Sequence, residues 1–576
     1  MSTIDLLFIL AISIICIISC SHILKYKLYA GNPIHKMNNS IYNIISKYYM
    51  VFVIFIFAAA VFVRIYKFGV MPYGFNQDEA MAALEGLTLS KYGTDHYGVS
   101  FPVYFEAWTG YGQMNVLLSY ILIPFFKIFG VSIFTARLPL LVFSLISIYV
   151  LYRFSYRIFG KFAALAILFF IAINPWHIMI SRWALEANLF PHFVLYALYL
   201  LYLGITKHKI YLYLSMILFG MSMYSYGISY YAVPVLLIIL CIYLLYTKVL
   251  KVRHILISSV IYILISFPIF LMMAVNYFEW ESINISFMTI SYFETGQRMN
   301  DILFFSENMY MQFIHNLAST MGVLVQYPDG CPWNSIPSVG TVYFCAIPLF
   351  ITGFVLMIKK FFNNKNTKEK VGIFIIIAFF ITAFISGIIT NYVNINRINL
   401  IFIPLIIFAG FAIYTICKRF NFLVIPIVLM FSFLFVNFSN EYFNGDHADY
   451  LGHCFYYGYS DALVHVKDLN YDKIYITADT MGDSPFVSEI IALFSLEVDN
   501  KYYLGEVELS DPDGNVFLPY HERYIYRVSY YDIAPDDIGT IYIINEYEKY
   551  LFDGLEEYFE FESFGGYCAV IHKEFI

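Results

Sequence analysis

The chain has 576 residues, of which 60% are hydrophobic and 13% are charged, and its mean hydropathy is +0.69. A soluble domain carries about 25% charged residues, so this composition excludes a soluble globular protein and indicates many membrane spans. The net charge is −7, but the charges are unevenly distributed. From Asn440 onward the chain has 7 Lys/Arg and 27 Asp/Glu, whereas the part before Asn440 is basic. Neither part suggests a nucleic-acid partner.

Apolar runs along most of the chain are long enough to cross the hydrocarbon core of a membrane. No small-residue cleavage site follows the first run, so we interpret it as a retained span and not as a signal peptide. With the basic cytoplasmic loop behind it, it forms an extra N-terminal unit, residues 1–48. The predicted spans are 5–24, 49–66, 134–152, 161–176, 188–205, 210–226, 231–247, 255–275, 341–358, 372–390, 399–416 and 421–438.

A further apolar stretch, residues 113–129, is interpreted with the positive-inside rule. If it does not cross, 19 of the 27 Lys/Arg residues before the tail lie in loops on one side, together with a single acid, Glu369. If it crossed, this asymmetry would collapse. We therefore expect 113–129 to be a helix along the outer interface of a transmembrane module, residues 49–439, whose outer loops include 67–133 and 277–340.

The tail, residues 440–576, is predicted to be a small α/β domain on the outer face, which follows about twelve spans. The segments "YDKIYIT", "RYIYRVSYY" and "GTIYIINEY" alternate like strands, whereas "SDALVHVKDLN" and "PFVSEIIALFSLE" have helical spacing. Cys454 and Cys568 are candidates for a disulfide if this domain is extracytoplasmic. The cysteines lack metal-type spacing, and "DPDG" at 511–514 is typical of a turn, so we predict no metal site.

Two adjacent acids, Asp78 and Glu79, follow the second span in "GFNQDEAMAALEG". The simplest interpretation is a solvated loop start, because acids at a membrane boundary are ordinary. The long loop behind them is rich in Gly, Tyr and acids, which favours a functional role, and a carboxylate there can act as a general base. Asp78 and Glu79 are therefore candidate catalytic residues, and His96, Tyr104 and Glu106 are candidate substrate-binding residues.

A further outer acid, Glu186, stands four residues after Arg182 in "NPWHIMISRWALEANLFPHF". In a helix this spacing places the two side chains next to each other, either as an interfacial ion pair or as part of one cavity with Asp78. Arg137 and Arg397 stand at the same face, each at the start of a span. Snorkelling explains single arginines, but several arginines with carboxylates favour a site for an anionic lipid headgroup. Glu186 is a third catalytic candidate, and the arginines are substrate-binding candidates.

The order of short motifs, with "DEA" in the first loop, "RLP" at a span start and "NPWHIMISRWALEANL" in a later loop, resembles the GT-C membrane glycosyltransferases. Within them it is similar to the bacterial branch of the dolichyl-phosphate-mannose–protein mannosyltransferase family (glycosyltransferase family 39), over roughly residues 50–275. The resemblance implies inverting transfer of one sugar from a polyprenyl-phosphate sugar, with Asp78 as the base. The His-Pro-Pro stretch and the MIR domain of the eukaryotic enzymes are missing, so protein O-mannosylation does not follow.

No GxGxxG or Walker A motif is present, so a cytoplasmic nucleotide-binding domain has no support. The expected partners are a polyprenyl-phosphate sugar donor, an extracytoplasmic acceptor and the bilayer of the cell membrane, and no cofactor is expected. Two other functions stay open. A transporter or flippase of lipid-linked sugars usually buries ionisable groups near the bilayer midplane, whereas these acids stand at the outer boundary. A non-catalytic cell-surface scaffold would leave the boundary acids without a role.

Overall fold

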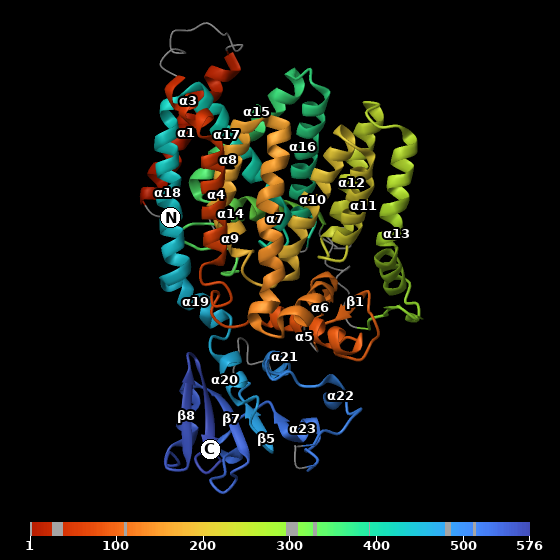
Figure 1. Cartoon of the computed structure of the whole chain (residues 1–576), viewed down its shortest axis with the longest axis vertical. Coiled ribbons are helices and arrows are strands. Elements are labelled where there is room, and N and C mark those ends of the chain that lie inside the picture. The colour runs from red at the N-terminus through yellow and green to blue at the C-terminus, as the bar shows by residue number, and fades with distance from the viewer. Residues whose placement is uncertain are drawn as a thin grey trace.

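The computed structural model of the chain describes residues 3–25, 39–108, 112–294, 309–325, 331–390, 392–478, 485–510 and 514–575. Two parts are stacked along the long axis of the molecule, a bundle of long helices and a smaller domain that contains a β-sheet (Figure 1). The last helix of the bundle, α18 (Val424–Asn444), leads through α19 (Asp446–Cys454) into the smaller domain.

Within these residues, nine helices are long and apolar enough to cross a membrane, and three of the shorter apolar helices coincide with the remaining predicted spans and pack in the same bundle. Each of the twelve predicted spans overlaps one of these helices, so the polytopic helical fold class is confirmed. The long helices are α1 (Thr3–Lys25), α7 (Ile133–Phe159), α10 (Glu186–Thr206), α12 (Ser229–Tyr246), α13 (Val252–Tyr277), α15 (Ile347–Asn363), α16 (Thr367–Ile388), α17 (Phe402–Arg419) and α18; the shorter ones are α4 (Tyr49–Ile65), α8 (Lys161–Ala172) and α11 (Lys209–Ser222).

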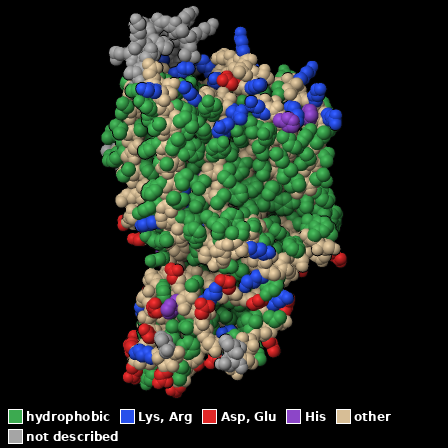
Figure 2. Space-filling view, viewed as in Figure 1, with side chains coloured by type: hydrophobic (Ala, Val, Ile, Leu, Met, Phe, Trp, Pro, Cys, Tyr) green, Lys and Arg blue, Asp and Glu red, His purple; other side chains and the backbone are tan. Residues whose placement is uncertain are grey.

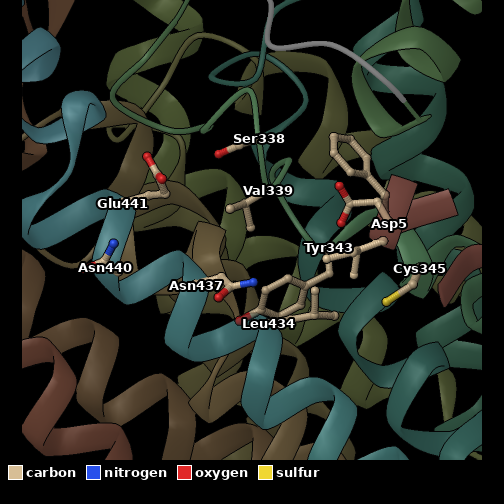
Figure 3. Close-up of a pocket in the computed structure, with 11 residues that line it drawn as sticks. Asp5, Ser338, Val339, Tyr343, Cys345, Leu434, Asn437, Asn440 and Glu441 are labelled. Atoms are coloured by element: carbon tan, nitrogen blue, oxygen red, sulfur yellow. The ribbon is translucent and has the colours of Figure 1, made fainter. Parts of the chain in front are cut away.

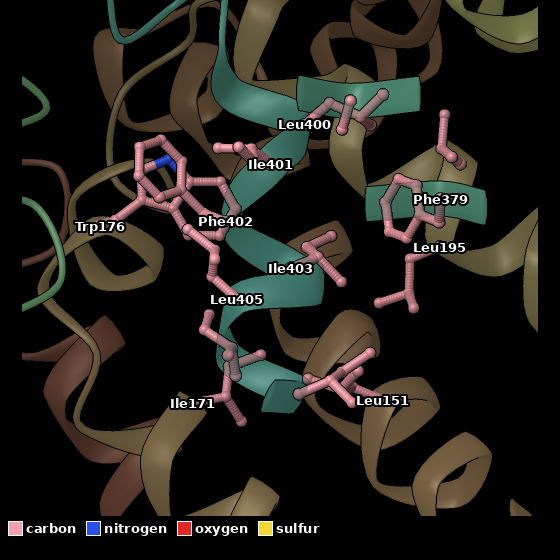
Figure 4. Packing of buried hydrophobic residues seen from close by; sticks show 14 of the residues in the cluster. Leu151, Ile171, Trp176, Leu195, Phe379, Leu400, Ile401, Phe402, Ile403 and Leu405 are labelled. Atoms are coloured by element: carbon pink, nitrogen blue, oxygen red, sulfur yellow. The ribbon is translucent and has the colours of Figure 1, made fainter. Parts of the chain in front are cut away.

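The core of the bundle is built around α17, whose residues are almost all buried. Its side chains meet apolar residues of the neighbouring helices, with Ile403 close to Leu195 of α10 and Phe379 of α16 (Figure 4). The Phe402 ring packs on the Trp176 ring at 5.0 Å between centroids. A helix that is apolar on all sides is expected at the centre of such a bundle.

Two helices of the first loop lie at the end of the bundle that faces the smaller domain (Figure 1). They are α5 (Gln77–Tyr92) and α6 (Leu117–Phe129), which pack against each other, and α6 also packs against α7. The place of α6 agrees with the interfacial helix expected at 113–129. The remaining elements of this part are α3 (Asn39–Lys47), α9 (Pro175–Met179), α14 (Met309–Val325), η3 (Phe344–Ala346), η4 (Asn399–Ile401), η5 (Asn421–Leu423) and the hairpins β1 (Tyr104–Glu106)–β2 (Gln113–Asn115) and β3 (Ile283–Ile285)–β4 (Met288–Ile290).

Charged side chains gather at the two ends of the molecule and leave a green apolar band between them (Figure 2). Lys, Arg and His side chains crowd the end of the bundle away from the smaller domain, and acids dominate the smaller domain. This is the distribution on which the predicted topology depends. The bundle is therefore a multi-pass membrane module.

The smaller domain is built on one five-stranded sheet with the order β6-β5-β7-β9-β8. The strand β5 pairs in parallel with β6 and β7, whereas β9 pairs antiparallel with β7 and β8. Two helices pack on one face of the sheet, and 3₁₀ segments cover the other. The elements are α20 (Tyr459–Val466), β5 (Lys473–Ile476), α21 (Pro485–Ser495), α22 (Asn500–Tyr503), α23 (Tyr520–Arg523), β6 (Tyr524–Ile525), η6 (Tyr530–Asp532), β7 (Thr540–Asn545), η7 (Glu546–Phe552), β8 (Phe559–Phe564) and β9 (Tyr567–His572).

All eight cysteines are free thiols in this structure. Cys454 ends α19, and Cys568 lies in β9 beside Ala569. The possible disulfide between Cys454 and Cys568 is therefore not formed here.

Candidate active site

Asp78 and Glu79 occupy the first turn of α5, a helix that Asn76 caps. The Asn76 side chain accepts a hydrogen bond from the Asp78 N–H (3.0 Å), and the Glu79 carboxylate accepts one from the Asn76 N–H (3.3 Å). This reciprocal arrangement is a capping box, which fixes where a helix starts. Asp78 is exposed, whereas Glu79 is fully buried. The two adjacent acids therefore have opposite environments.

Glu79 forms a buried, two-pronged ion pair with Arg137 of α7. The Arg137 Nε and Nη2 atoms donate to the two carboxylate oxygens at 2.9 and 2.7 Å. The same guanidinium also donates to the main-chain oxygens of Gly69, Pro72 and Gly74. All five N–H donors of Arg137 thus meet protein acceptors, in contrast to the contact with a phosphate that the sequence suggested.

Arg182 is also buried, and it donates hydrogen bonds to main-chain oxygens at the C-terminal end of α4. Its guanidinium donates to four main-chain oxygens, those of Val63, Arg64, Tyr66 and Met71, at 2.6 to 3.2 Å. The helix α10 begins only at Glu186, so Arg182 lies before the helix. The expected side-by-side pair on one helix is therefore wrong, because the helical spacing does not extend back to residue 182.

Glu186 begins α10 at the centre of a polar cluster that the first loop completes. Its Oε2 accepts a hydrogen bond from the Asn115 N–H at 2.6 Å, and the Asn115 side-chain oxygen accepts one from the Tyr230 hydroxyl at 2.7 Å. Tyr104 lies opposite Asn115 in the β1–β2 register, and its ring packs edge-on against Tyr230. The structure thus places both Glu186 and Tyr104 beside Asn115. Asn115, which the sequence reasoning missed, links them, and its only signal was its place in the same long loop.

A hydrogen bond from the Ala184 N–H to the Glu79 carboxylate, 2.7 Å long, joins the two acid-bearing segments. Ala184 lies two residues before Glu186, and Glu79 follows Asp78. The exposed Asp78 and the Glu186 cluster therefore belong to the same end of the bundle.

Arg397 lies in the segment before η4, and this segment is fastened to the first turn of α10. The Asn399 side chain donates to the Ala187 carbonyl oxygen at 3.0 Å and to the Asn188 side-chain oxygen at 3.3 Å. Arg397 itself is half-buried, and its guanidinium lies 3.9 Å from the centre of the Tyr392 ring. Among the candidate arginines it alone is partly exposed, because Arg137 and Arg182 are fully buried.

His96 belongs to a second acidic cluster, between α5 and the smaller domain. Its Nδ1 contacts the buried Glu85 carboxylate, its ring stacks on Trp108, and Trp108 donates to Glu489 of α21 at 3.2 Å. Burial lowers the pKa of His96 to about 4 and raises the pKa of Glu85. Burial, helped by the Glu85 charge, raises the pKa of Asp95 to about 7. This cluster joins the two parts of the protein, and it does not include Glu186.

Glu106, the last substrate-binding candidate, is half-buried at the end of β1 opposite Gln113. Over the described ranges, no three His, Cys, Asp or Glu side chains are arranged to hold a metal ion. Residues 511–513 of the "DPDG" turn lie outside those ranges.

A cavity of about 240 Å³ lies in another part of the bundle, between the first turn of α1, residues 338–345 and α18 (Figure 3). Asp5 and Glu441 line it from opposite sides, with Asn437 between them and Asn440 beside Glu441. None of the predicted site residues lines this cavity.

Residues 115–276 match the family model of the dolichyl-phosphate-mannose-protein mannosyltransferases. This segment is similar to that family. It runs from β2 into α13 and includes Asn115, Arg137, Arg182 and Glu186, so the resemblance drawn from the short motifs is confirmed. Among curated proteins, none matches the chain at a significant level.

Two solved structures are similar to most of the length of the chain. ArnT from Cupriavidus metallidurans bound to undecaprenyl phosphate has 12% identity and a TM-score of 0.49, over 90% of this chain and 97% of that one. The archaeal oligosaccharyltransferase AglB from Archaeoglobus fulgidus, in complex with an inhibitory peptide and a dolichol-phosphate, also has 12% identity and a TM-score of 0.49, over 92% of this chain and 75% of that one.

Proposed function

We propose that the protein is an inverting glycosyltransferase that moves one sugar from a polyprenyl-phosphate donor to an acceptor outside the cell membrane. The family match of residues 115–276 supports the class of reaction. The observation that carries the proposal is the hydrogen bond from the Ala184 N–H to the Glu79 carboxylate. Glu79 is the neighbour of the exposed Asp78, and Ala184 lies two residues before Glu186. The bond therefore ties the segment of the exposed carboxylate to the polar cluster around Glu186.

In this reaction Asp78 is the general base. It takes the proton of an acceptor hydroxyl while that oxygen attacks the anomeric carbon of the sugar. The bond between the anomeric carbon and the phosphate oxygen breaks, the configuration inverts, and polyprenyl phosphate leaves with the bonding electrons. An exposed carboxylate at a helix start is suited to this task, because water and a dissolved acceptor can reach it.

The donor is held by groups near the start of α10. Arg397 faces the phosphate, whose growing negative charge a guanidinium stabilises. Glu186 and Tyr104 face the sugar hydroxyls, together with Asn115. Glu79, Arg137 and Arg182 have a different role in this proposal, since their hydrogen bonds hold the main chain that carries Asp78 and Glu186.

The reaction takes place on the side of the smaller domain, which we place outside the cell. The crowding of Lys, Arg and His side chains at the opposite end of the bundle supports this orientation (Figure 2). A lipid-bound donor and a dissolved acceptor can meet only at this boundary, and Asp78 stands there.

The test is sugar transfer in reconstituted vesicles with a panel of radiolabelled polyprenyl-phosphate sugars. The wild type is compared with Asp78→Asn and with the matched control Asp449→Asn, which changes an exposed acid in α19. We expect turnover by the wild type and the control and none by Asp78→Asn, with equal thermal stability in all three. Equal turnover in all three would exclude Asp78 as the base, and transmembrane movement of the lipid-linked sugar without its transfer would favour a flippase.

A further inference from the structure

The segment between α19 and α20, residues 455–458, touches the chain immediately before α5. The Phe75 N–H donates to the Phe455 carbonyl oxygen at 2.6 Å. Gly74 has a φ of +83°, and a Cβ at this position would lie 2.1 Å from the same oxygen. The approach of the two main chains is thus so close that only glycine fits at residue 74.

The next residue of the segment reaches the helix that carries the proposed base. The Tyr456 hydroxyl donates to the Gln77 side-chain oxygen at 3.1 Å, and the Tyr456 side chain is 3% exposed. Gln77 is the first residue of α5 and the direct neighbour of Asp78. Tyr456 therefore holds the helix one residue away from Asp78.

The other side of the segment is fixed to the sheet of the smaller domain. The Gly566 N–H, in the turn between β8 and β9, donates to the Tyr457 carbonyl oxygen at 3.0 Å. Gly458 has a φ of +90°, and a Cβ there would lie 1.2 Å from the Phe564 carbonyl oxygen. The segment is thus enclosed between the β8–β9 hairpin and the start of α5.

We propose that Phe455 and Tyr456 position Asp78, so that the smaller domain is a working part of the active site. Phe455 and Tyr456 are positioning residues that act through Gly74, Phe75 and Gln77. A displacement of about 1 Å at a catalytic group can reduce turnover by a factor of about 100, and the direct contacts of Phe455 and Tyr456 prevent such a displacement at the start of α5. The catalytic part of this proposal rests on the proposed function of Asp78.

The first experiment removes one hydrogen bond with Tyr456→Phe and uses Tyr457→Phe, which changes the neighbouring half-exposed tyrosine, as the matched control. Hydrogen–deuterium exchange of residues 77–80 reports the position of the helix start without any substrate. We expect exchange there to be several-fold faster in Tyr456→Phe and unchanged in the control. We also expect a kcat about tenfold lower at an unchanged KM for the donor, as displacement of a group that acts in the transition state predicts.

The second experiment compares Gly74→Ala with Gly130→Ala. Both glycines have a positive φ, +83° and +80°, but a Cβ at Gly130 meets nothing within 4 Å. Both variants therefore strain the backbone, whereas only Gly74→Ala displaces Phe455. We expect faster exchange at residues 77–80 and a loss of turnover only in Gly74→Ala.

The outcomes separate this proposal from the proposed function. Unchanged exchange in both Tyr456→Phe and Gly74→Ala would overturn the positioning, whatever the activity. Faster exchange with unchanged kcat would overturn its catalytic part. Wild-type protein that transfers no sugar from any donor would count against the proposed function alone, and the exchange result would still decide whether Phe455 and Tyr456 hold the start of α5.

Discussion

Asp78 and Glu79 are neighbours in the chain, yet their removal should have opposite effects. Glu79→Gln keeps the size of the side chain and leaves an oxygen for the Ala184 N–H. It removes the charge that balances Arg137, and it turns an amide N–H₂ toward a guanidinium donor. Because both partners are fully buried, breaking the pair should cost about 3–5 kcal/mol of folding stability.

The assay is thermal unfolding of the purified protein in detergent, with Asp78→Asn measured beside Glu79→Gln. The exposed Asp78 makes little difference to folding, so its variant should stay within about 0.5 kcal/mol of the wild type while it loses sugar transfer. The loss of folding stability in Glu79→Gln should persist at high salt, because salt hardly screens a buried ion pair. A Glu79→Gln protein as stable as the wild type would refute a structural role for this ion pair.

Three further predictions concern other parts of the site. Burial raises the pKa of Asp95 to about 7, so its carboxyl is protonated in the folded protein and ionised in the unfolded chain between about pH 4 and pH 7. The contribution of the Asp95 carboxyl to folding stability is therefore present at low pH and is lost as the pH rises toward 7. Between about pH 5.5 and 7.5 the wild type should therefore lose roughly 2 kcal/mol more than Asp95→Asn, and equal losses in thermal unfolding would contradict this. Arg182→Lys should lower thermal stability by about 2–4 kcal/mol, because an ammonium cannot serve four carbonyl oxygens in the plane of a guanidinium; an unchanged melting temperature would exclude that role. Glu186→Gln should raise the KM for the lipid-linked sugar about tenfold at unchanged stability, and steady-state kinetics with an unchanged KM would remove Glu186 from the donor site.

The membrane part of the fold could be predicted from the sequence, because hydropathy and charge act locally. The spans follow from runs of apolar residues, and the place of residues 113–129 follows from the sidedness of Lys and Arg. The β8–β9 hairpin was missed for a physical reason. All six residues of β9 are buried, so this strand lacks the alternation by which half-buried strands are found.

The arrangement of the candidate site could be predicted only in part. The sequence indicated Asp78, Glu79 and Glu186, but it could not show which neighbouring acid faces water. That difference depends on Arg137, which is 58 residues from Glu79 in the chain. Asn115 could not be predicted for the same reason, since it contacts Glu186, which is 71 residues away in the chain.

Three buried arginines explain how the chain between α4 and α5 is held so firmly. Arg64 donates to the carbonyl oxygens of Ala60, Ile171 and Ala172, and Arg182 and Arg137 take up further carbonyl groups between residues 63 and 74. The last carbonyl groups of a helix lack partners within the helix, and their partial negative charge favours a cation nearby. A single carboxylate, Glu79, balances Arg137, whereas Arg64 and Arg182 are directed mainly at main-chain oxygens. Apolar residues in their place would fill the volume but leave those oxygens unpaired, so the route of the chain toward Asp78 depends on guanidinium groups of fixed geometry.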